Sequence, residues 1–483
     1  MGLKRIWNKH ALVFGAAVAG AAAVIIALVW PVTDLIAAHD VGVLTGVHRT
    51  LQLQAAREAV RTQLLTLGAG VFAAGALVYT ARNFALSRST FRATEVRVLN
   101  ERFVTIAAQL GDDQAAVRLA GIHAMAGLAD DWEENRQTCI DVLCAYLRMP
   151  YVPDPGKDAP AAERLAFGAH REVRHTIIRV IAAHLRAGAP VSWQRLRFDF
   201  TGVVFDGGDF SGAEFSGGRV SFDGAEFFGG EIDFSRAKFC GDGASFSGVK
   251  FSGAKVGFNF AEFSGRDRVV FDGAEFSGGS VDFDSAKFPL VGISCDGTEF
   301  SGGKVSFNNA TFSGIWASFG GAEFSGGLVD FGTAKFTGGG TDFSDAKFSG
   351  AKVSFYFAEF SGRDRTDVAN ASVSHIGSVD FSNAMFSRGE VDFSSAQFTG
   401  AGASFREAEF TGSKVDFTMA GFSGGTVSFS GAKFSRSDVS FYSAKFSGGA
   451  VDFSSPGEWS HPPMFSFTGT PPPGVSLPEG HAV

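Results

Sequence analysis

The sequence predicts a β-solenoid that is preceded by a small all-α segment and by a two-span transmembrane hairpin. Three observations lead to this fold class. The chain contains 62 Gly and 52 Phe among its 483 residues, and most of the phenylalanines recur at a fixed spacing after residue 199. Residues 11–30 carry no charged side chain. A fixed repeat is typical of a solenoid, and about 20 apolar residues can span a bilayer.

The repeat is visible in the spacing of the phenylalanines. From Phe200 to Phe215 the steps are five residues long, and they then alternate between seven and five as far as Phe453, with a few irregular steps such as the eight residues from Phe263 to Phe271. This spacing gives 43 centres, of which 40 are Phe. The remaining three centres are expected to fill phenylalanine positions: Cys295, Val368 and Val373.

The alternation within each repeat predicts short extended sides. In an extended segment, residues two apart point the same way, so Val281 and Phe283 face inward while Asp282 faces water. Four such sides close a coil of 24 residues, and the next coil stacks on it at about 4.8 Å. Glycine pairs such as Gly278–Gly279 form every second corner. The 43 sides therefore predict ten to eleven coils. The predicted aromatic core includes Phe222, Phe227, Phe234, Phe239, Phe283, Phe288, Phe343 and Phe348.

The five-residue units resemble a known repeat. "AEFSG" at Ala274–Gly278 and "AKFSG" at Ala346–Gly350 combine a small residue, a polar residue, a central Phe, Ser and Gly. This pattern resembles the pentapeptide-repeat family, in its bacterial membrane-anchored type with a helical segment before the repeats. The resemblance covers more than half of the chain. It implies a right-handed four-sided β-helix.

Residues 1–85 predict a transmembrane helical hairpin. The spans are residues 11–30 and 62–80, and basic residues lie before the first and after the second. The positive-inside rule then places both chain ends in the cytoplasm, and the family resemblance implies a multi-pass protein of a bacterial plasma membrane. The first span could instead be a signal peptide. Gly70 and Ala74 have the spacing of a helix-packing motif, which permits a homodimer.

The rest of the chain divides into three parts. Residues 86–193 contain amphipathic runs such as "VRVLNERFVTIAAQL" and predict a helical domain that caps the first coil. Residues 194–455 form the β-helix. Residues 456–483 are expected to be a C-terminal cap around Trp459 followed by a disordered tail. A cap is needed because an open coil exposes unpaired strand edges.

The sequence contains no pattern that predicts catalysis, a metal site or a cofactor. The four cysteines are scattered, which favours reduced thiols. His170 and His175 are five residues apart, whereas a helical zinc pair is separated by four. No phosphate-binding loop or serine elbow occurs. We therefore expect a non-enzymatic protein.

One irregularity in the repeat predicts a docking site. "SGRDR" occurs at Ser264–Arg268 and again at Ser361–Arg365, four coils apart. Both insertions would lie on the same corner, about 19 Å apart. Arginine binds carboxylates and phosphates in a bidentate manner, but two solvated loops would look the same. The candidate docking residues are Arg266, Asp267, Arg268, Arg363, Asp364 and Arg365.

Two functions fit these features. The first is a membrane-anchored scaffold that binds an unidentified protein along a rigid rod. The alternative is implied by the family resemblance, which includes acidic rods that mimic DNA and bind type II topoisomerases. Residues 201–455 contain 31 Asp and Glu against 20 Lys and Arg. That balance disfavours direct nucleic-acid binding, while the interspersed lysines weaken the mimicry.

Overall fold

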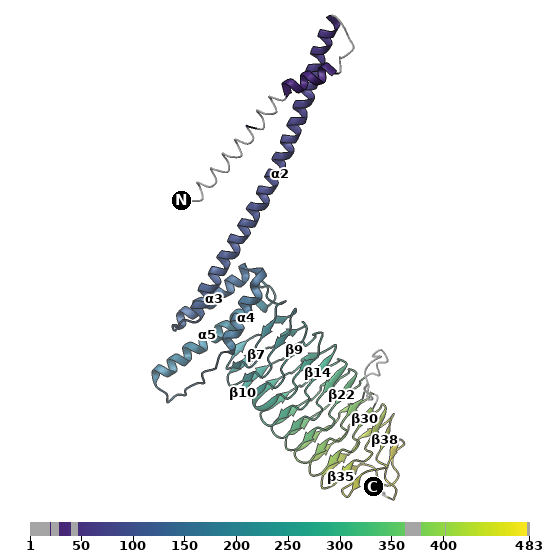
Figure 1. Ribbon diagram of the computed structural model, residues 1–483. Coiled ribbons are helices and arrows are strands. Elements are labelled where there is room, and N and C mark those ends of the chain that lie inside the picture. Colours follow the sequence, from purple (N-terminus) through teal and green to yellow (C-terminus); the bar gives the residue numbers. More distant parts are fainter. Residues whose placement is uncertain (1–19, 21–28, 40–46, 363–377, 401, 481–483) are drawn as a thin grey trace. The chain divides into compact units, whose positions relative to one another are not determined.

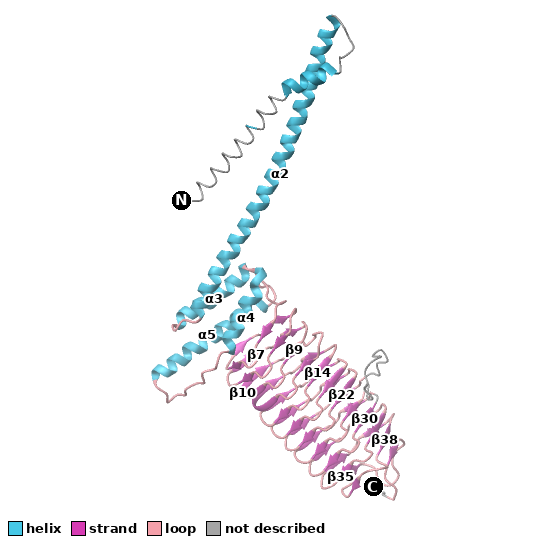
Figure 2. Cartoon of the chain, viewed as in Figure 1, coloured by secondary structure: helices cyan, strands magenta, loops and turns pink. Residues whose placement is uncertain are grey.

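The computed structural model describes residues 20, 29–39, 47–362, 378–400 and 402–480. The chain forms two compact units, Met1–Asn100 and Glu101–Val483. Figure 1 shows the helices that precede the solenoid in the chain and the stacked coils that follow. Figure 2 separates the helices from the strands of the solenoid by colour.

The first unit contains a short helix over residues 29–39 and most of the long helix α2 (Val47–Leu110). Arg57 forms an ion pair of 2.8 Å with Asp34, and the guanidinium of Arg61 lies 4.6 Å from the ring centre of Trp30. Among the described residues, Thr50–Arg88 is the one helical stretch with the length and apolar composition of a membrane span. The first predicted span lies almost entirely outside the described residues, so the hairpin stays a prediction.

The second unit begins with a small group of helices. They are the end of α2, then α3 (Ala115–Asp131), the 3-10 helix η1 (Glu133–Asn135), α4 (Arg136–Arg148) and α5 (Ala161–Leu185). Their apolar faces pack together, with Ile122, Leu143 and Ile177 fully buried. A loop over residues 149–160 connects α4 to α5, which begins at Ala161.

The solenoid has four faces, each made of parallel strands that pair from coil to coil, and coil follows coil for about eleven turns. Face 1 is a twelve-stranded sheet: β1 (Phe198–Asp199), β5 (Val220–Ser221), β9 (Ala244–Ser245), β11 (Val269–Val270), β14 (Gly292–Ser294), β18 (Trp316–Ser318), β22 (Gly340–Asp342), β26 (Val379–Asp380), β30 (Gly402–Ser404), β34 (Thr426–Ser428), β38 (Ala450–Asp452) and β41 (Val475–Ser476).

Faces 2 and 3 share the long strands β10 (Lys250–Gly257) and β12 (Glu275–Asp282). Face 2 also contains β2 (Val204–Phe205), β6 (Glu226–Phe227), β15 (Glu299–Phe300), β19 (Glu323–Phe324), β23 (Lys347–Phe348), β27 (Met385–Phe386), β31 (Glu409–Phe410), β35 (Lys433–Phe434) and β39 (Glu458–Trp459). Face 3 also contains β3 (Gly208–Asp209), β7 (Glu231–Asp233), β16 (Lys304–Ser306), β20 (Leu328–Asp330), β24 (Lys352–Ser354), β28 (Glu390–Asp392), β32 (Lys414–Asp416), β36 (Asp438–Phe441) and β40 (Met464–Phe465).

Face 4 is formed by the shortest strands, and isolated bridges of Glu262 join its first two strands to the rest. Its strands are β4 (Glu214–Phe215), β8 (Lys238–Phe239), β13 (Lys287–Phe288), β17 (Thr311–Phe312), β21 (Lys335–Phe336), β25 (Glu359–Phe360), β29 (Gln397–Phe398), β33 (Gly421–Phe422) and β37 (Lys445–Phe446).

The core consists of phenylalanine rings stacked along the solenoid. The ring centres of Phe283 and Phe307 are 4.7 Å apart and nearly parallel, as are those of Phe288 and Phe312 at 5.0 Å. Val281, two residues before Phe283, is buried as well. The eight phenylalanines chosen from the sequence are each at most 1% exposed. Each stacked pair adds about 0.5–1.5 kcal/mol beyond the burial of its area.

The strand register fixes the coil at 24 residues, because Glu275 pairs with Glu299 and Glu299 with Glu323. The register contradicts one expectation from the sequence. Phe360 pairs with Phe398, which lies 38 residues further on. Phe381 stacks on Phe343 and takes the side that follows Phe360, while Val368 and Val373 themselves lie outside the described residues. Such an insertion at a corner leaves the stack intact, since loop closure becomes costlier only slowly with length.

The tight corners use the left-handed backbone region. Fourteen non-glycine residues have φ between +54° and +64°, and each lies two positions after a core phenylalanine. An L-residue in this region costs about 1–2 kcal/mol. The sequence had indicated glycines only at the other corners, where β12 does bulge at Gly278–Gly279. Twelve of the fourteen lie in five-residue steps, whose tight turn imposes a left-handed residue whether or not it is glycine, and Leu290 and Arg436 lie in seven-residue steps.

The last coil closes differently from the expectation. Trp459 follows Phe434 in the face 2 column, with ring centres 5.2 Å apart, and Phe465 stacks on Phe441 at 5.4 Å. The segment expected to be a disordered tail contributes β41, which pairs with β38 and buries Val475. This pairing provides hydrogen-bond partners for backbone groups of β38 that would otherwise be unpaired.

The glycine ladder at the spacer corners gives a stability prediction. Gly303 has φ +72°, and a Cβ there would lie 2.7 Å from the carbonyl oxygen of Gly279 in the preceding coil. Gly297 has φ +61°, but a Cβ there would meet nothing within 4 Å. Gly297→Ala should therefore cost about 1–2 kcal/mol from the backbone alone, and Gly303→Ala clearly more. Thermal unfolding of both variants checks this, and equal losses would contradict the collision.

Candidate functional site

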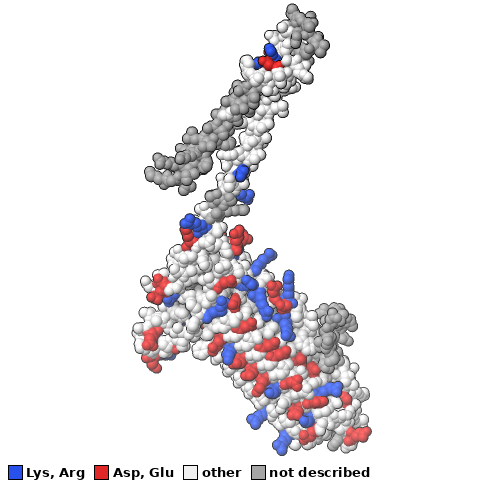
Figure 3. Space-filling view, viewed as in Figure 1, with Lys and Arg blue, Asp and Glu red and all other residues white. Residues whose placement is uncertain are grey.

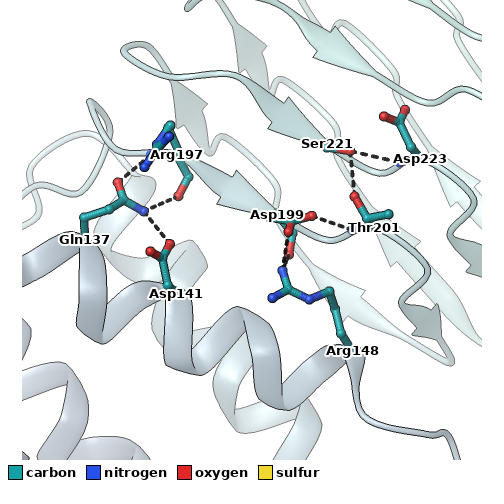
Figure 4. A network of polar contacts seen from close by, with 8 residues as sticks. All are labelled: Gln137, Asp141, Arg148, Arg197, Asp199, Thr201, Ser221 and Asp223. Carbon is teal, nitrogen blue, oxygen red and sulfur yellow. Dashed lines mark hydrogen bonds and ion pairs between the residues drawn. The ribbon is translucent and has the colours of Figure 1, made fainter.

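Helices α4 and α5 meet the open edge of the first coil. A coil at the end of a solenoid leaves backbone carbonyls without the N–H groups of a preceding coil. Arginines donate to these carbonyls instead. Arg148 donates to the Asp199 oxygen at 2.9 Å, Arg174 to Val204 at 2.8 Å, and Arg186 to Ser211 at 2.9 Å. Figure 4 shows Arg148 reaching from α4 to Asp199.

A buried carboxylate anchors α5 to the same edge. Asp206 accepts hydrogen bonds from His175 at 2.8 Å, Arg171 at 3.1 Å and Tyr151 at 3.2 Å. Burial alone would raise the pKa of Asp206, but the bond and charge of His175, the charge of Arg171 and the bond from Tyr151 outweigh it and hold the pKa below its usual value. The ionised form is therefore the one that stabilises the junction.

The segment between α5 and the first coil is held on both sides. The ring nitrogen of Trp193 donates to Asp130 at 2.9 Å, and its ring stacks on His184 at 3.9 Å. The side chain of Gln137 both donates to and accepts from the backbone of Arg197, at 2.9 and 3.0 Å. Figure 4 shows this clamp. The helices thereby fix the backbone of Arg197, and the residue is exposed.

Arg197 belongs to a group of exposed arginines on the corner between faces 4 and 1. We call this group the arginine corner: Arg195, Arg197, Arg219, Arg266 and Arg268. Its loops stack coil on coil. The N–H of Gly217 bonds the Gln194 oxygen at 3.2 Å, and the N–H of Arg266 bonds the Gly241 oxygen at 3.0 Å. Glycines allow this approach, since a Cβ on Gly217 would lie 2.3 Å from the Arg195 backbone.

The arginine corner is little neutralised, in contrast with six of the eleven lysines of the rod. Six lysines form ion pairs with glutamates of neighbouring coils, such as Lys255 with Glu231 at 2.8 Å and Lys433 with Glu409 at 2.7 Å. In the arginine corner, the only ion pair within the described residues is Arg266 with Asp242 at 4.0 Å, and the Arg266 side chain is 87% exposed. Asp267 is the other carboxylate of these loops.

This corner contains half of the docking site predicted from the sequence. Arg266, Asp267 and Arg268 are exposed on it, whereas Arg363, Asp364 and Arg365 lie outside the described residues. The phenylalanines before the two insertions, Phe263 and Phe360, belong to the same face 4 column.

Sequence reasoning missed three arginines of the corner. Arg195, Arg197 and Arg219 lie outside any insertion, so nothing in the local repeat marks them. The available signal was the coil period. Phe198 pairs with Val220, and Val220 with Ala244. Arg197 and Arg219 therefore occupy equivalent positions in successive coils, and Arg268 occupies that position two coils later.

The remaining surface of the solenoid is acidic. Figure 3 shows Asp and Glu across the visible face, with Lys and Arg mainly along its borders. On face 2 three glutamates follow one another in adjacent coils, Glu275, Glu299 and Glu323, with Lys250 before them and Lys347 after them. Glu275 forms an ion pair of 3.1 Å with Lys250, so the negative potential of the column is concentrated at Glu299 and Glu323, whose like charges repel at a separation of about 4.8 Å.

The sequence predicts no catalytic or metal-binding role for the cysteines and histidines. All four cysteines are free thiols. Burial raises the pKa of Cys139 to about 11 and that of Cys144 to about 12, so neither is a thiolate at neutral pH. His170 and His175 both lie on α5. Across the described part of the chain, no group of three His, Cys, Asp or Glu residues could hold a metal ion.

Comparisons with known proteins add little to this geometry. No protein-family profile matches the chain, and no curated protein matches its sequence. Among solved structures, the chain is similar to QnrB1, a plasmid-mediated fluoroquinolone resistance protein, with 15% identity over 46% of this chain and 92% of that chain, at a TM-score of 0.14. A likeness this weak identifies neither family nor function. The fold assignment rests on the coil itself.

The Asp206 cluster predicts a pH-dependent contribution to stability. Asp206→Asn keeps the shape of the side chain but removes its charge, and it should destabilise the junction by about 2 kcal/mol or more, since hydrogen bonds between charged groups are lost. Because the folded pKa is depressed, this stabilisation is present above the ordinary aspartate pKa of about 3.9 and is lost as the pH falls below it.

The measurement is the difference in Tm between the native protein and Asp206→Asn across pH 7 to 3. That difference should shrink towards zero at the acid end. Asp438→Asn changes an exposed carboxylate with no side-chain bond among the described residues, and it should leave Tm unchanged throughout. A difference that persists undiminished at pH 3 would show that ionisation of Asp206 is not the cause.

Proposed function

We propose that the protein is a non-enzymatic scaffold linked to a membrane, which presents its β-solenoid in the cytoplasm and docks an acidic partner protein at the arginine corner. The observation that carries the proposal is the contrast in charge pairing. Six of the eleven lysines of the rod form ion pairs with glutamates of neighbouring coils. Five arginines gather on one corner with a single ion pair of 4.0 Å among the described residues. Arginine is also the residue suited to bidentate capture of carboxylates.

The surroundings favour a protein partner over a nucleic acid. The rod carries 31 Asp and Glu against 20 Lys and Arg, so a long polyanion approaching it would be repelled beyond the corner itself. A partner with a local acidic segment would contact the arginines and avoid the acidic faces. The rigid support also matters, because the Gln137 clamp and the stacked loops hold the corner in place without a partner.

The membrane link rests on composition. Thr50–Arg88 has the length and hydropathy of a span, residues 11–30 carry no charge, and Arg82, Arg88 and Arg92 follow the second apolar stretch. A cytoplasmic position of the solenoid follows from these basic residues by the positive-inside rule. The span would confine the docking corner to the membrane and raise its effective concentration towards other membrane-bound proteins.

A second candidate function is topoisomerase binding by mimicry of DNA. It is favoured by the column of Glu275, Glu299 and Glu323, which repeats a negative charge at about 4.8 Å along the rod. Phosphates likewise dominate the recognition of DNA. Lys250 pairs with Glu275 at 3.1 Å and Lys347 follows Glu323, so the column is a short mimic.

The arginine corner can be tested in cells. The triple variant Arg219→Ser, Arg266→Ser and Arg268→Ser should lower chemical crosslinking of the tagged full-length protein to its specific partners at least tenfold, because each arginine contributes a charge-assisted contact of about 1.5–3 kcal/mol. Mass spectrometry of the crosslinked species measures this. The same complexes should weaken when purified at high salt.

The matched control is Arg388→Ser, Arg406→Ser and Arg436→Ser, which removes three exposed arginines elsewhere on the rod. It should retain the partners, and both triple variants should keep a Tm close to that of the native protein. Partners that persist in the first variant would refute the arginine corner as the docking site. Topoisomerase subunits lost on replacing Glu299 and Glu323 with Gln would favour the alternative.

A further inference from the structure

The corner between faces 3 and 4 exposes large apolar side chains in conformations that do not suit them. Phe357 and Met419 lie in the left-handed region, with φ of +55° and +58°, and are 52% and 54% exposed. Beside them, Tyr356 and Tyr442 are 47% and 61% exposed. Glycine, and to a lesser extent asparagine or aspartate, suits this backbone conformation, and burial within the chain does not compensate for the strain of the larger residues.

These residues form one line along the solenoid, which we call the corner stripe. It comprises the first and second positions after Phe355, Phe393, Phe417 and Phe441, which stack ring on ring in four consecutive coils. The first positions are Tyr356, Ser394, Thr418 and Tyr442. The second positions are Phe357, Ser395, Met419 and Ser443.

The second row alternates large and small residues. Ser395 is only 7% exposed between Phe357 and Met419 of the neighbouring coils, so it forms the floor of a hollow. If a second copy of the row is placed against the first in the opposite direction, Phe357 faces Ser443 of the second copy and Met419 faces Ser395 of the second copy. Each large side chain therefore lies over a serine. The first row reads Tyr, Ser, Thr, Tyr, and reversal brings tyrosine against tyrosine and small residue against small residue.

We infer that two copies of the chain associate through their corner stripes, with the rods antiparallel about a two-fold axis. This arrangement is isologous, so the pattern needs to match only itself. The charges beside the stripe agree with it. On face 4, Glu359 lies in the first of the four coils and Lys445 in the last, and reversal places Glu359 of one copy beside Lys445 of the second copy, twice per dimer.

The opposite flank brings Asp392 of one copy towards Asp416 of the second copy. Both carboxylates already accept a hydrogen bond from their own turn, from the N–H of Ser394 and of Thr418, each at 2.8 Å, which draws their charge away from the contact. A parallel two-fold pairing is less favourable, because it places the Ser394–Ser395 hollow against itself. The inference does not depend on the arginine corner, which lies on a different edge of the solenoid.

One residue of the same corner supplies a matched control. Phe260 has φ +57° and is 59% exposed, but the guanidinium of Arg236 lies 5.7 Å from its ring centre. It belongs to the coil of Phe258, four coils before Phe355. Phe260 therefore shares the strain and the exposure but lies outside the stripe.

The test is co-purification of two differently tagged full-length chains from one cell. The double variant Phe357→Ser and Met419→Ser should reduce co-purification at least tenfold, whereas Phe260→Ser should leave it unchanged. Both should keep a Tm close to that of the native protein, because they replace exposed side chains and leave the backbone conformation unchanged, which separates lost association from lost folding. Unchanged co-purification in the double variant, or none with native chains, would overturn the inference.

Charge reversal tests the antiparallel direction. Glu359→Lys and Lys445→Glu should each weaken co-purification several-fold, and the combined variant should restore it, since the pairs are rebuilt with opposite sign. Failure of the combined variant to recover while the single variants weaken association would exclude the antiparallel arrangement.

Discussion

The solenoid depends on one constraint: the backbone of every coil must form hydrogen bonds with the coils on both sides in the same register. The stacked phenylalanines set that register, because a ring shifted by one residue would point to solvent. Glycine spacers allow the backbones to approach where a Cβ would collide, as at Gly303. The outward positions are free of this demand, so all functional variation is confined to side chains before the phenylalanines and to the corners.

The same constraint explains why the two terminal coils need other partners for the backbone groups that no further coil can bind. At the start, Arg148, Arg174 and Arg186 supply donors in place of a missing coil. A long side chain from a helix can reach a carbonyl that no strand reaches, and its charge strengthens the bond. At the other end, β41 pairs with β38 and the wide ring of Trp459 covers the face 2 column. The starting end therefore joins the helices to the rod through charged contacts, and the arginine corner lies beside that joint.

The sequence alone predicts the coil because its inward residues are chemically uniform, and the structure confirms the 24-residue period. It fails where a local pattern imitates a repeat. Val368 and Val373 are apolar and five apart, so they look like core centres, but only pairing between coils shows that Phe381 takes the next side. The left-handed corners were missed for the opposite reason, since residues such as Met419 carry no local sign of a positive φ.

Site prediction from this sequence was limited in the same physical way. An insertion such as "SGRDR" is visible because it breaks the period, whereas Arg197 and Arg219 become neighbours only when the chain is wound at that period. A solenoid turns residues about 24 positions apart into adjacent side chains. Its binding surfaces are therefore formed by residues from several coils. The corner stripe and the arginine corner are recognised only when residues at equivalent positions of successive coils are compared.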